Sequence, residues 1–271
     1  MEKGKSPIAW YYADFLRLIK FSIRPIYSGK HLETMAQPSN ASSHLTSASV
    51  NHRVTRVWDL PTRLFHWALA LCVIGLLTTG FLGGNAMPWH FRFGYCVLTL
   101  LLFRIIWGFV GGTWSRFSSF IFAPKHVINY LKGRHDPMHE VGHNPMGALS
   151  VLAMLSFLVA QVATGLFSDD EIAASGPLTM FVANATVQQA TNYHANIGKF
   201  ILIVLVVTHV LAIAFYFVKK RENLIKPMLD GDKVLPPNVL ATRDTTKSRL
   251  IALIILATCA MAVYWLVSLG G

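Results

Sequence analysis

Five long apolar stretches are the feature that most constrains the fold of this chain of 271 residues. A helix that crosses a bilayer needs about 20 mostly apolar residues. The stretches that meet or nearly meet this length are Leu64–Leu82, Phe91–Val110, Met146–Phe167, Ile197–Val218 and Leu250–Leu269. Only 14% of the residues are charged, against roughly 25% in a soluble domain. The sequence therefore predicts an all-α integral membrane protein in the lipid bilayer, with five transmembrane helices.

The net charge of +11 is concentrated in some of the connections between these stretches. Lys and Arg gather before the first stretch, between the second and third, and from Lys219 to Arg249, whereas residues 83–90 and 168–193 contain none. Because positive residues stay on the cytoplasmic side, we expect a cytoplasmic N-terminus and a C-terminus outside. Nucleic-acid binding is excluded, because no basic patch is interleaved with exposed aromatic residues or lies in a recognised motif.

Residues 1–53 precede the membrane part and are expected to form a cytoplasmic extension and linker. The beginning is basic and aromatic, and it could form an amphipathic helix at the membrane surface. Alternatively, Met35 is the true initiator. The sequence leaves both readings open.

Four histidines lie in or at the ends of the apolar stretches, namely His66, His90, His194 and His209. A polar ring in hydrocarbon is costly, so such residues usually face the interior of a bundle and have a function. Each alone could be a helix-end residue that is hydrogen-bonded to a neighbouring carbonyl. Their arrangement favours a functional role.

The spacing of the four histidines predicts two pairs. His194 and His209 lie 15 residues apart in the fourth stretch, which is ~22 Å along a helix. Their directions differ by about 60°, so both face the same half of the helix, one in each leaflet. The expected topology puts His90 level with His194 on the outer side and His66 level with His209 on the cytoplasmic side. Two facing imidazoles can fill both axial positions of a haem iron, and without a CxxCH motif the haem would be held non-covalently, as haem b.

Motifs around these histidines add a resemblance to a known family. They are Val57–Trp67 (VWDLPTRLFHW), Thr79-Gly80, Gly94-Tyr95, Phe103–Gly108 (FRIIWG), Gly142–Gly147 (GHNPMG), Thr164–Phe167 (TGLF) and Asn223–Ile225 (NLI), with Gly231 at the end. Over about two thirds of the chain the sequence resembles the bacterial cytochrome b561 family, which includes the b-type cytochrome subunits of nickel–iron hydrogenases.

The resemblance implies a four-helix transmembrane bundle that holds two haems b. Its ligand positions match His66 and His209 for the cytoplasmic haem, and His90 and His194 for the outer haem. Residues 54–231 would then form the di-haem cytochrome b domain. Residues 232–271 add a cytoplasmic loop and one additional C-terminal transmembrane helix, which departs from the family pattern. The location would be the bacterial inner membrane, with the C-terminus in the periplasm.

The function that the resemblance implies is electron transport in a respiratory chain. We expect a membrane-bound cytochrome that relays electrons between the quinone pool and a periplasmic or membrane partner, a c-type cytochrome or a dehydrogenase subunit. The chain could thus act as a quinone oxidoreductase. Alternatives within the fold are the cytochrome b anchor subunit of a hydrogenase-like dehydrogenase and a superoxide oxidase. A haem-free transporter or sensor is the alternative of another class, although the sequence lacks the paired Gly or Pro breaks of transport sites.

Further polar residues have two readings each. Arg104 within the second stretch, and Arg92 and Lys199 near the outer pair, could neutralise haem propionates or extend to the membrane surface. His143 suits a helix cap or a quinone site better than iron ligation. Asp59 could accept protons from quinol, or it could make a helix-end contact.

Overall fold

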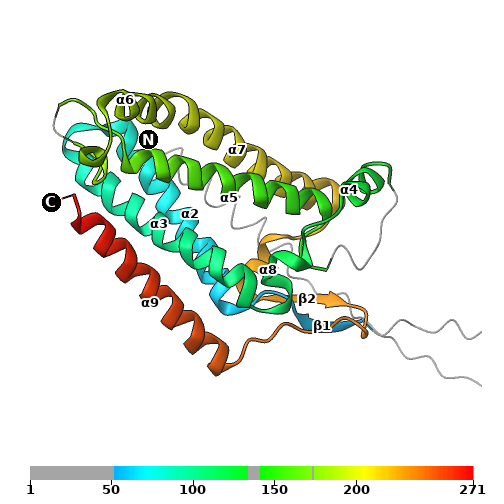
Figure 1. The fold of residues 1–271 in the computed structure, drawn as a ribbon. Helices are drawn as coiled ribbons and strands as arrows, with labels where there is room; N and C mark the ends of the chain where they lie inside the picture. Colours follow the sequence, from blue (N-terminus) through cyan, green and yellow to red (C-terminus); the bar gives the residue numbers. More distant parts are fainter. Residues whose placement is uncertain (1–51, 134–140, 173, 271) are drawn as a thin grey trace, which may run out of the picture. The chain divides into compact units, whose positions relative to one another are not determined.

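The computed structural model describes residues 52–133, 141–172 and 174–270 (Figure 1). Nearly all of the expected extension and linker lies outside these residues, and so does the choice between a surface helix and a start at Met35. All of the described residues belong to one unit of the chain.

Within the described residues, five helices are long and apolar enough to cross a membrane, and each carries one of the predicted stretches. This confirms the mostly helical, multi-span prediction. Four of them are α2 (Leu60–Leu82), α3 (Met87–Val110), α5 (Pro145–Leu166) and α9 (Thr246–Ser268). Short 3₁₀ turns lie between them at Gly84–Ala86, Thr113–Ser115, Phe117–Ser119 and Thr179–Phe181.

The fourth spanning helix is longer than its apolar stretch and contains two π-helical segments. It begins with the polar α6 (Asn184–Asn192), passes through a π-helix at Tyr193–Gly198, and continues as α7 (Lys199–Phe215). A second π-helix, Tyr216–Lys220, ends it. We call Tyr193–Gly198 the π segment. π-Helical turns are rare in proteins, and those that occur are often found at functional sites.

The helices pack around a shared apolar core. α2 lies along α3, α5 lies along α7, and contacts between α3 and α5 join these two pairs (Figure 1). α9 packs mainly against α3. The buried side chains include Phe65, Leu101, Trp107, Leu158 and Cys259, which come from α2, α3, α5 and α9.

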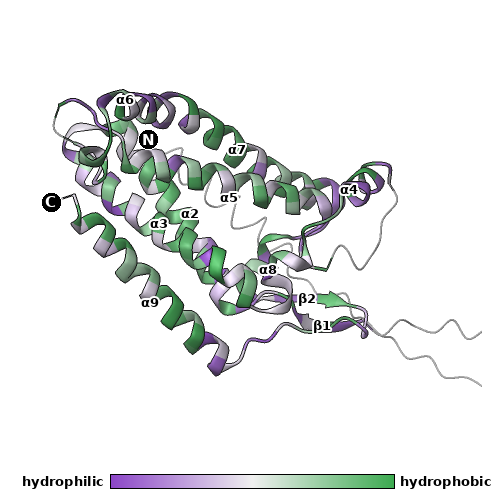
Figure 2. Ribbon diagram, viewed as in Figure 1, coloured by the Kyte–Doolittle hydropathy of each residue, from purple (hydrophilic) through white to green (hydrophobic). Residues whose placement is uncertain are grey.

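Much of the apolar surface of these helices faces outward. Leu71, Val204 and Ile254 are 68%, 63% and 58% exposed, and Figure 2 shows predominantly hydrophobic ribbons along α5, α7 and α9. Monomeric soluble proteins rarely expose apolar patches of more than a few hundred Å². This surface fits contact with lipid, and it agrees with the apolar composition of the stretches.

Side-chain caps begin three of the spanning helices. The carboxylate of Asp59 accepts the Thr62 N–H at 2.8 Å, and the Asn144 side chain accepts the Gly147 N–H at 2.7 Å. In these two helices, α2 and α5, a proline lies in the first turn, where a backbone N–H would have no partner within the helix. Thr245 and Ser248 form a reciprocal capping box at the beginning of α9.

Two short strands lie at one end of the helices, so the all-α prediction was incomplete. β1 (Arg53–Arg56) pairs antiparallel with β2 (Asp232–Leu235), so that Arg56 lies opposite Asp232. The short helices α4 (Pro124–Leu131) and α8 (Ile225–Asp230) lie at the same end (Figure 1). α6 lies at the other end, and we call these the strand end and the α6 end.

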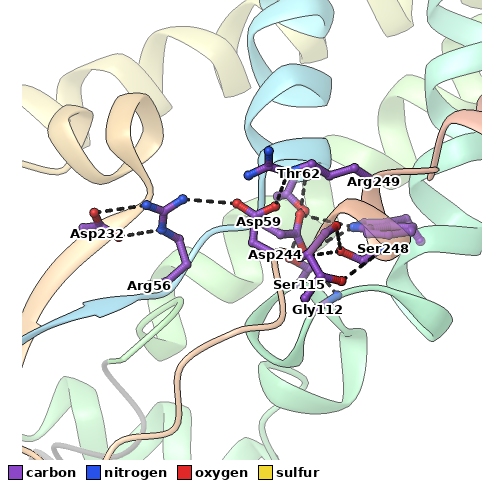
Figure 3. Close-up of polar contacts among 11 residues, drawn as sticks. Arg56, Asp59, Thr62, Gly112, Ser115, Asp232, Asp244, Ser248 and Arg249 are labelled. Atoms are coloured by element: carbon purple, nitrogen blue, oxygen red, sulfur yellow. Dashed lines mark hydrogen bonds and ion pairs between the residues drawn. The ribbon is translucent and has the colours of Figure 1, made fainter. Parts of the chain in front are cut away.

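An ion-pair network connects the strands with α9. Arg56 contacts Asp232 at 2.6 Å and Asp244 at 3.1 Å, and Asp244 also contacts Arg249 at 2.9 Å (Figure 3). Burial alone would raise the pKa of Asp244, but hydrogen bonds from Arg249, the Leu60 main chain and Arg56 outweigh it and lower that pKa. The network therefore favours a charged Asp244, and it ties the beginning of α9 to the strand end.

Candidate functional site

Two histidines meet near the α6 end and form what we call site A. His90 lies in the first turn of α3, and His194 lies in the π segment. Their ring centres are 6.1 Å apart and their planes are inclined by 86°. The structure thus brings together the pair that the sequence analysis assigned to the outer haem.

Main-chain hydrogen bonds orient both rings of site A. His90 Nδ1 lies 3.1 Å from the carbonyl oxygen of Leu76, and His194 Nδ1 lies 2.8 Å from that of Gln161. A carbonyl oxygen only accepts, so each Nδ1 carries the proton and each Nε2 keeps a free lone pair. This is the tautomer and the support that metal-binding histidines commonly have.

Glycines make room around these rings. A Cβ atom on Gly165 of α5 would lie 2.8 Å from His194 Cε1, and one on Gly80 of α2 would lie 3.2 Å from His90 Cε1. Beside the rings is a cavity of about 260 Å³, which both histidines line together with these glycines and Gly94. Site A is therefore a mostly apolar cavity with two imidazoles.

The other two histidines meet towards the strand end, at what we call site B. His66 lies in the second turn of α2, and His209 lies in α7. Their ring centres are 6.5 Å apart and their planes are inclined by 56°. His66 Nδ1 is buried and has no hydrogen-bond partner among residues 52–133, 141–172 and 174–270. This pair, too, is the one expected from the sequence.

The separation within each pair suits one metal ion between the rings. A metal–imidazole bond is about 2 Å long, so the centres of two rings on opposite sides of one ion lie roughly 6 Å apart. Over the described part of the chain, no cluster of three or more His, Cys, Asp or Glu could hold a metal. Two opposed imidazoles alone do not complete a protein metal site, but they do complete the axial coordination of a haem.

A buried cation lies close to His143, on which His66 of site B also acts. Arg104 of α3 is only 3% exposed, and its Nη1 has no hydrogen-bond partner within the described ranges. Its guanidinium lies 4.9 Å from the ring centre of Phe117. A buried, unsatisfied guanidinium is costly, and an acidic group such as a haem propionate would satisfy it. These residues therefore fit a haem at this end.

The other two predicted cations are placed differently. Lys199 lines the cavity of site A, and its ammonium nitrogen lies 5.6 Å and 5.4 Å from the ring centres of Phe81 and Phe200. Arg92 is not among the described residues that line this cavity. Its guanidinium lies 4.7 Å from the ring centre of Trp89. Lys199 is therefore the better placed of the two to meet a group bound at site A.

His143 lies between aromatic rings rather than capping α5. Its ring centre is 4.7 Å from that of Trp58 and 4.6 Å from that of Phe120, and the cap of α5 is Asn144. Burial, followed by the charges of Arg104, Lys233 and His66, lowers the pKa of His143 to about 3. The imidazole is therefore neutral at physiological pH.

Asp59 makes a helix-end contact, which is one of the two roles that the sequence predicts for it. Its carboxylate is fully buried and accepts hydrogen bonds from four donor groups (Figure 3). The donors are the N–H groups of Thr62 and Gly112, the hydroxyl of Ser115 at 2.8 Å and the indole N–H of Trp107 at 3.3 Å. These bonds join α2 to the end of α3 and occupy the carboxylate.

Sequence reasoning missed the residues that hold the two histidine rings of site A. Leu76 acts through its carbonyl, which gives no side-chain signal. Gln161 gives one, because it is an amide in the apolar run of α5, and a polar side chain at membrane depth indicates a specific partner.

Comparisons with known proteins show the family of this chain. The model of a family described as prokaryotic cytochrome b561 matches residues 57–231, which leaves α9 outside the match. Three relatives are named as probable Ni/Fe-hydrogenase B-type cytochrome subunits. That of Bradyrhizobium diazoefficiens is 25% identical over 220 residues, which are 68% of this chain and 88% of the relative. That of Rhizobium leguminosarum bv. viciae is 24% identical over 237 residues (74% of this chain and 96% of the relative), and that of Azotobacter vinelandii is 27% identical over 216 residues (65% and 86%).

Because the family model covers more than half of the chain, this protein belongs to the prokaryotic cytochrome b561 family.

Proposed function

We propose that this chain is the b-type cytochrome subunit of a membrane-bound dehydrogenase of the hydrogenase kind, and that it relays electrons across the bilayer through two haems b. The observation that carries the proposal is the presence of two sites, A and B, each with two imidazole centres about 6 Å apart, and the continuous helix Asn184–Lys220 contributes one histidine to each. The names of the relatives favour this anchor role over a free-standing quinone relay.

The residues of each site have distinct roles in this proposal. His90 and His194 would hold one haem, and His66 and His209 the other. A haem b supplies one-electron redox chemistry at its iron, and the protein sets the ligands, the charge and the access of water. The Nδ1 bonds to Leu76 and Gln161 would leave the Nε2 atoms of site A free to bind a haem iron.

Charge neutralisation differs between the sites. Arg104 is placed to meet a propionate at site B, since its Nη1 is buried without a partner in the described part of the chain. Lys199 is placed to do so at site A, where it lines the cavity. Arg92 would have a weaker role at the edge of site A, because it lies against Trp89.

The proposed arrangement in the membrane follows the charges of the connections. Site B and the N-terminus would be cytoplasmic, and site A and the C-terminus periplasmic, in the bacterial inner membrane. Residues 54–231 would be the di-haem domain, and residues 232–271 would add a cytoplasmic loop and a fifth spanning helix. Quinone is the proposed electron acceptor in the membrane, and a dehydrogenase subunit the partner.

A reporter that is active only outside the cytoplasm tests this orientation. It should be active when fused after Asp170 or Gly271 and silent after Lys132 or Gly231. The opposite pattern would reverse the orientation and exchange the leaflets of the two sites.

A haem assay with a redox difference spectrum tests the function itself. The purified chain should contain two haems b per polypeptide and show the absorption of six-coordinate haem when reduced. Acidified solvent should extract both, because the sequence has no CxxCH motif for covalent attachment. A chain without haem would refute the proposal and leave the transporter or sensor class.

A further inference from the structure

Gln161 makes two hydrogen bonds to one residue, His194, across the contact between α5 and the π segment. Its side-chain Nε2 donates to the main-chain oxygen of His194 at 2.8 Å. Its main-chain oxygen accepts from His194 Nδ1, also at 2.8 Å. Gln161 therefore contacts both the backbone and the ring of His194.

The position of His194 in a π-helix explains why its backbone needs support. A π turn replaces the usual i→i−4 hydrogen bonds by wider ones, and such turns persist where the surroundings stabilise them. An amide donor aimed at a carbonyl of that turn supplies such stabilisation. Because the acceptor is a carbonyl, the amide must present its nitrogen there, which fixes its orientation.

Gly198 at the end of the π segment makes space for this amide. A Cβ atom on Gly198 would lie 2.1 Å from Gln161 Oε1 and 2.7 Å from the Tyr193 ring. No hydrogen-bond partner for this Oε1 is found among the described residues, and the atom is buried. The close fit leaves the amide little freedom to turn away from His194.

Within the described part of the chain, His90 is held differently. Its Nδ1 is held by the Leu76 carbonyl at 3.1 Å, with the Thr79 hydroxyl at 3.3 Å, inside the same α2–α3 pair. Both neighbours lie in a regular α-helix. The two histidines of site A therefore differ: among the described residues, the backbone of His194 accepts a hydrogen bond from a side chain of another helix, and that of His90 does not.

We propose that Gln161 is a positioning residue for His194, which holds the π segment in the register that directs His194 Nε2 into site A. The inference rests on the proposed function, because it gives Nε2 the role of an iron ligand. Without the amide, the π segment is free to relax. The bond from His194 should then weaken while the bond from His90 stays, and the haem of site A should become partly five-coordinate.

Carbon monoxide detects this state, because ferrous haem binds it only when an axial position is open. The test uses the full chain in a His66→Ala background, where site A holds the remaining haem. Gln161→Leu should raise the ratio of CO-binding to non-binding haem roughly tenfold, since it removes a buried hydrogen bond. Haem content should stay near that of the parent.

Two controls separate positioning from general destabilisation. In a His90→Ala background, where the remaining haem is at site B, Gln161→Leu should leave CO binding unchanged. Ser156→Ala, an exposed polar-to-apolar change in the same helix, should have no effect in either background. CO binding that rises equally in both backgrounds would overturn the proposal, and so would no rise at site A.

Gly198→Ala provides a second route, and it keeps the proposal testable if Gln161→Leu does not fold. Its methyl group would displace the Gln161 amide, so it should produce the same CO-binding signature. In combination with Gln161→Ala the two effects should not add, and additive effects would contradict a shared cause. If instead the parent chain lacks haem, or His194→Ala does not remove one, the proposed function fails, which these measurements distinguish from failure of the positioning role.

Discussion

Sites A and B each contain two histidines, and the helix Asn184–Lys220 contributes one of them to each site, yet their surroundings differ. At site A, both imidazoles donate to main-chain carbonyls, and glycines contact the rings. At site B, His66 Nδ1 has no such partner within the described ranges. The buried Arg104 and His66 both lower the pKa of His143, so the charge of Arg104 lies at this end of the molecule. Site A is thus shaped by backbone and steric fit, and site B by charge. Changes in packing should therefore affect A, and changes in charge should affect B.

Loss of a ligand should give the largest effect and should be confined to one site. His194→Ala should halve the haem content, because the remaining imidazole of site A cannot hold the haem alone. His209→Ala should remove the other haem to the same extent. The haem-to-protein ratio of each purified variant measures this. Loss of both haems from either single variant would show that the sites are not independent.

Gly165→Ala should weaken site A selectively. Its Cβ would lie 2.8 Å from His194 Cε1, and overpacking of this kind costs about 1–3 kcal/mol. We expect haem affinity at site A to fall by roughly tenfold or more, with site B unchanged. Haem transfer to an acceptor protein, followed in the His66→Ala and His90→Ala backgrounds, measures each site separately. Equal loss at both would contradict a local steric role.

Arg104→Leu should shift the potential of site B and leave that of site A in place. A positive charge stabilises the reduced state, so its removal should lower the potential. A charge about 10 Å away contributes roughly 1.7 kcal/mol at an effective dielectric of about 20. Potentiometric titration of the variant measures the shift, with Arg92→Leu as the control for an arginine that packs on an exposed Trp. A shift confined to site A would reverse the assignment of Arg104.

The Asp244 network should add a small, pH-dependent stabilisation at the strand end. Because the folded state lowers the pKa of Asp244, its contribution is present at neutral pH and is lost as pH falls below about 4. Asp244→Asn should cost about 1 kcal/mol at pH 7 and progressively less as the pH falls below that value. Thermal unfolding in detergent at several pH values measures this. A cost that grows with acidity would contradict the sign.

The spanning helices could be predicted because each is a long apolar run. The ends of the helices were harder to predict. α6 forms the beginning of the helix that carries His194, but it is too polar to be recognised by hydropathy. The strands β1 and β2 have four residues each, and their paired residues are far apart in the sequence: Arg56 and Asp232 are separated by 176 positions. No local pattern encodes such a pairing.

The histidine pairs could be predicted from spacing and charge, but their support could not. The predicted offset between His194 and His209 assumed regular α-helical winding, whereas His194 lies in a π segment. That segment is contacted by Gln161 of α5, and the local sequence does not reveal a contact between distant helices. Carbonyl acceptors such as that of Leu76 are invisible in a sequence, because every residue has one.

The most direct test of the account is the haem content of the double variant His90→Ala with His194→Ala. If these two residues hold the same haem, the second substitution has nothing further to remove. The double variant should then retain one haem per chain, as should each single variant. If each single variant retains one haem and the double variant retains none, His90 and His194 belong to different haems, and the pairing on which this account rests is wrong.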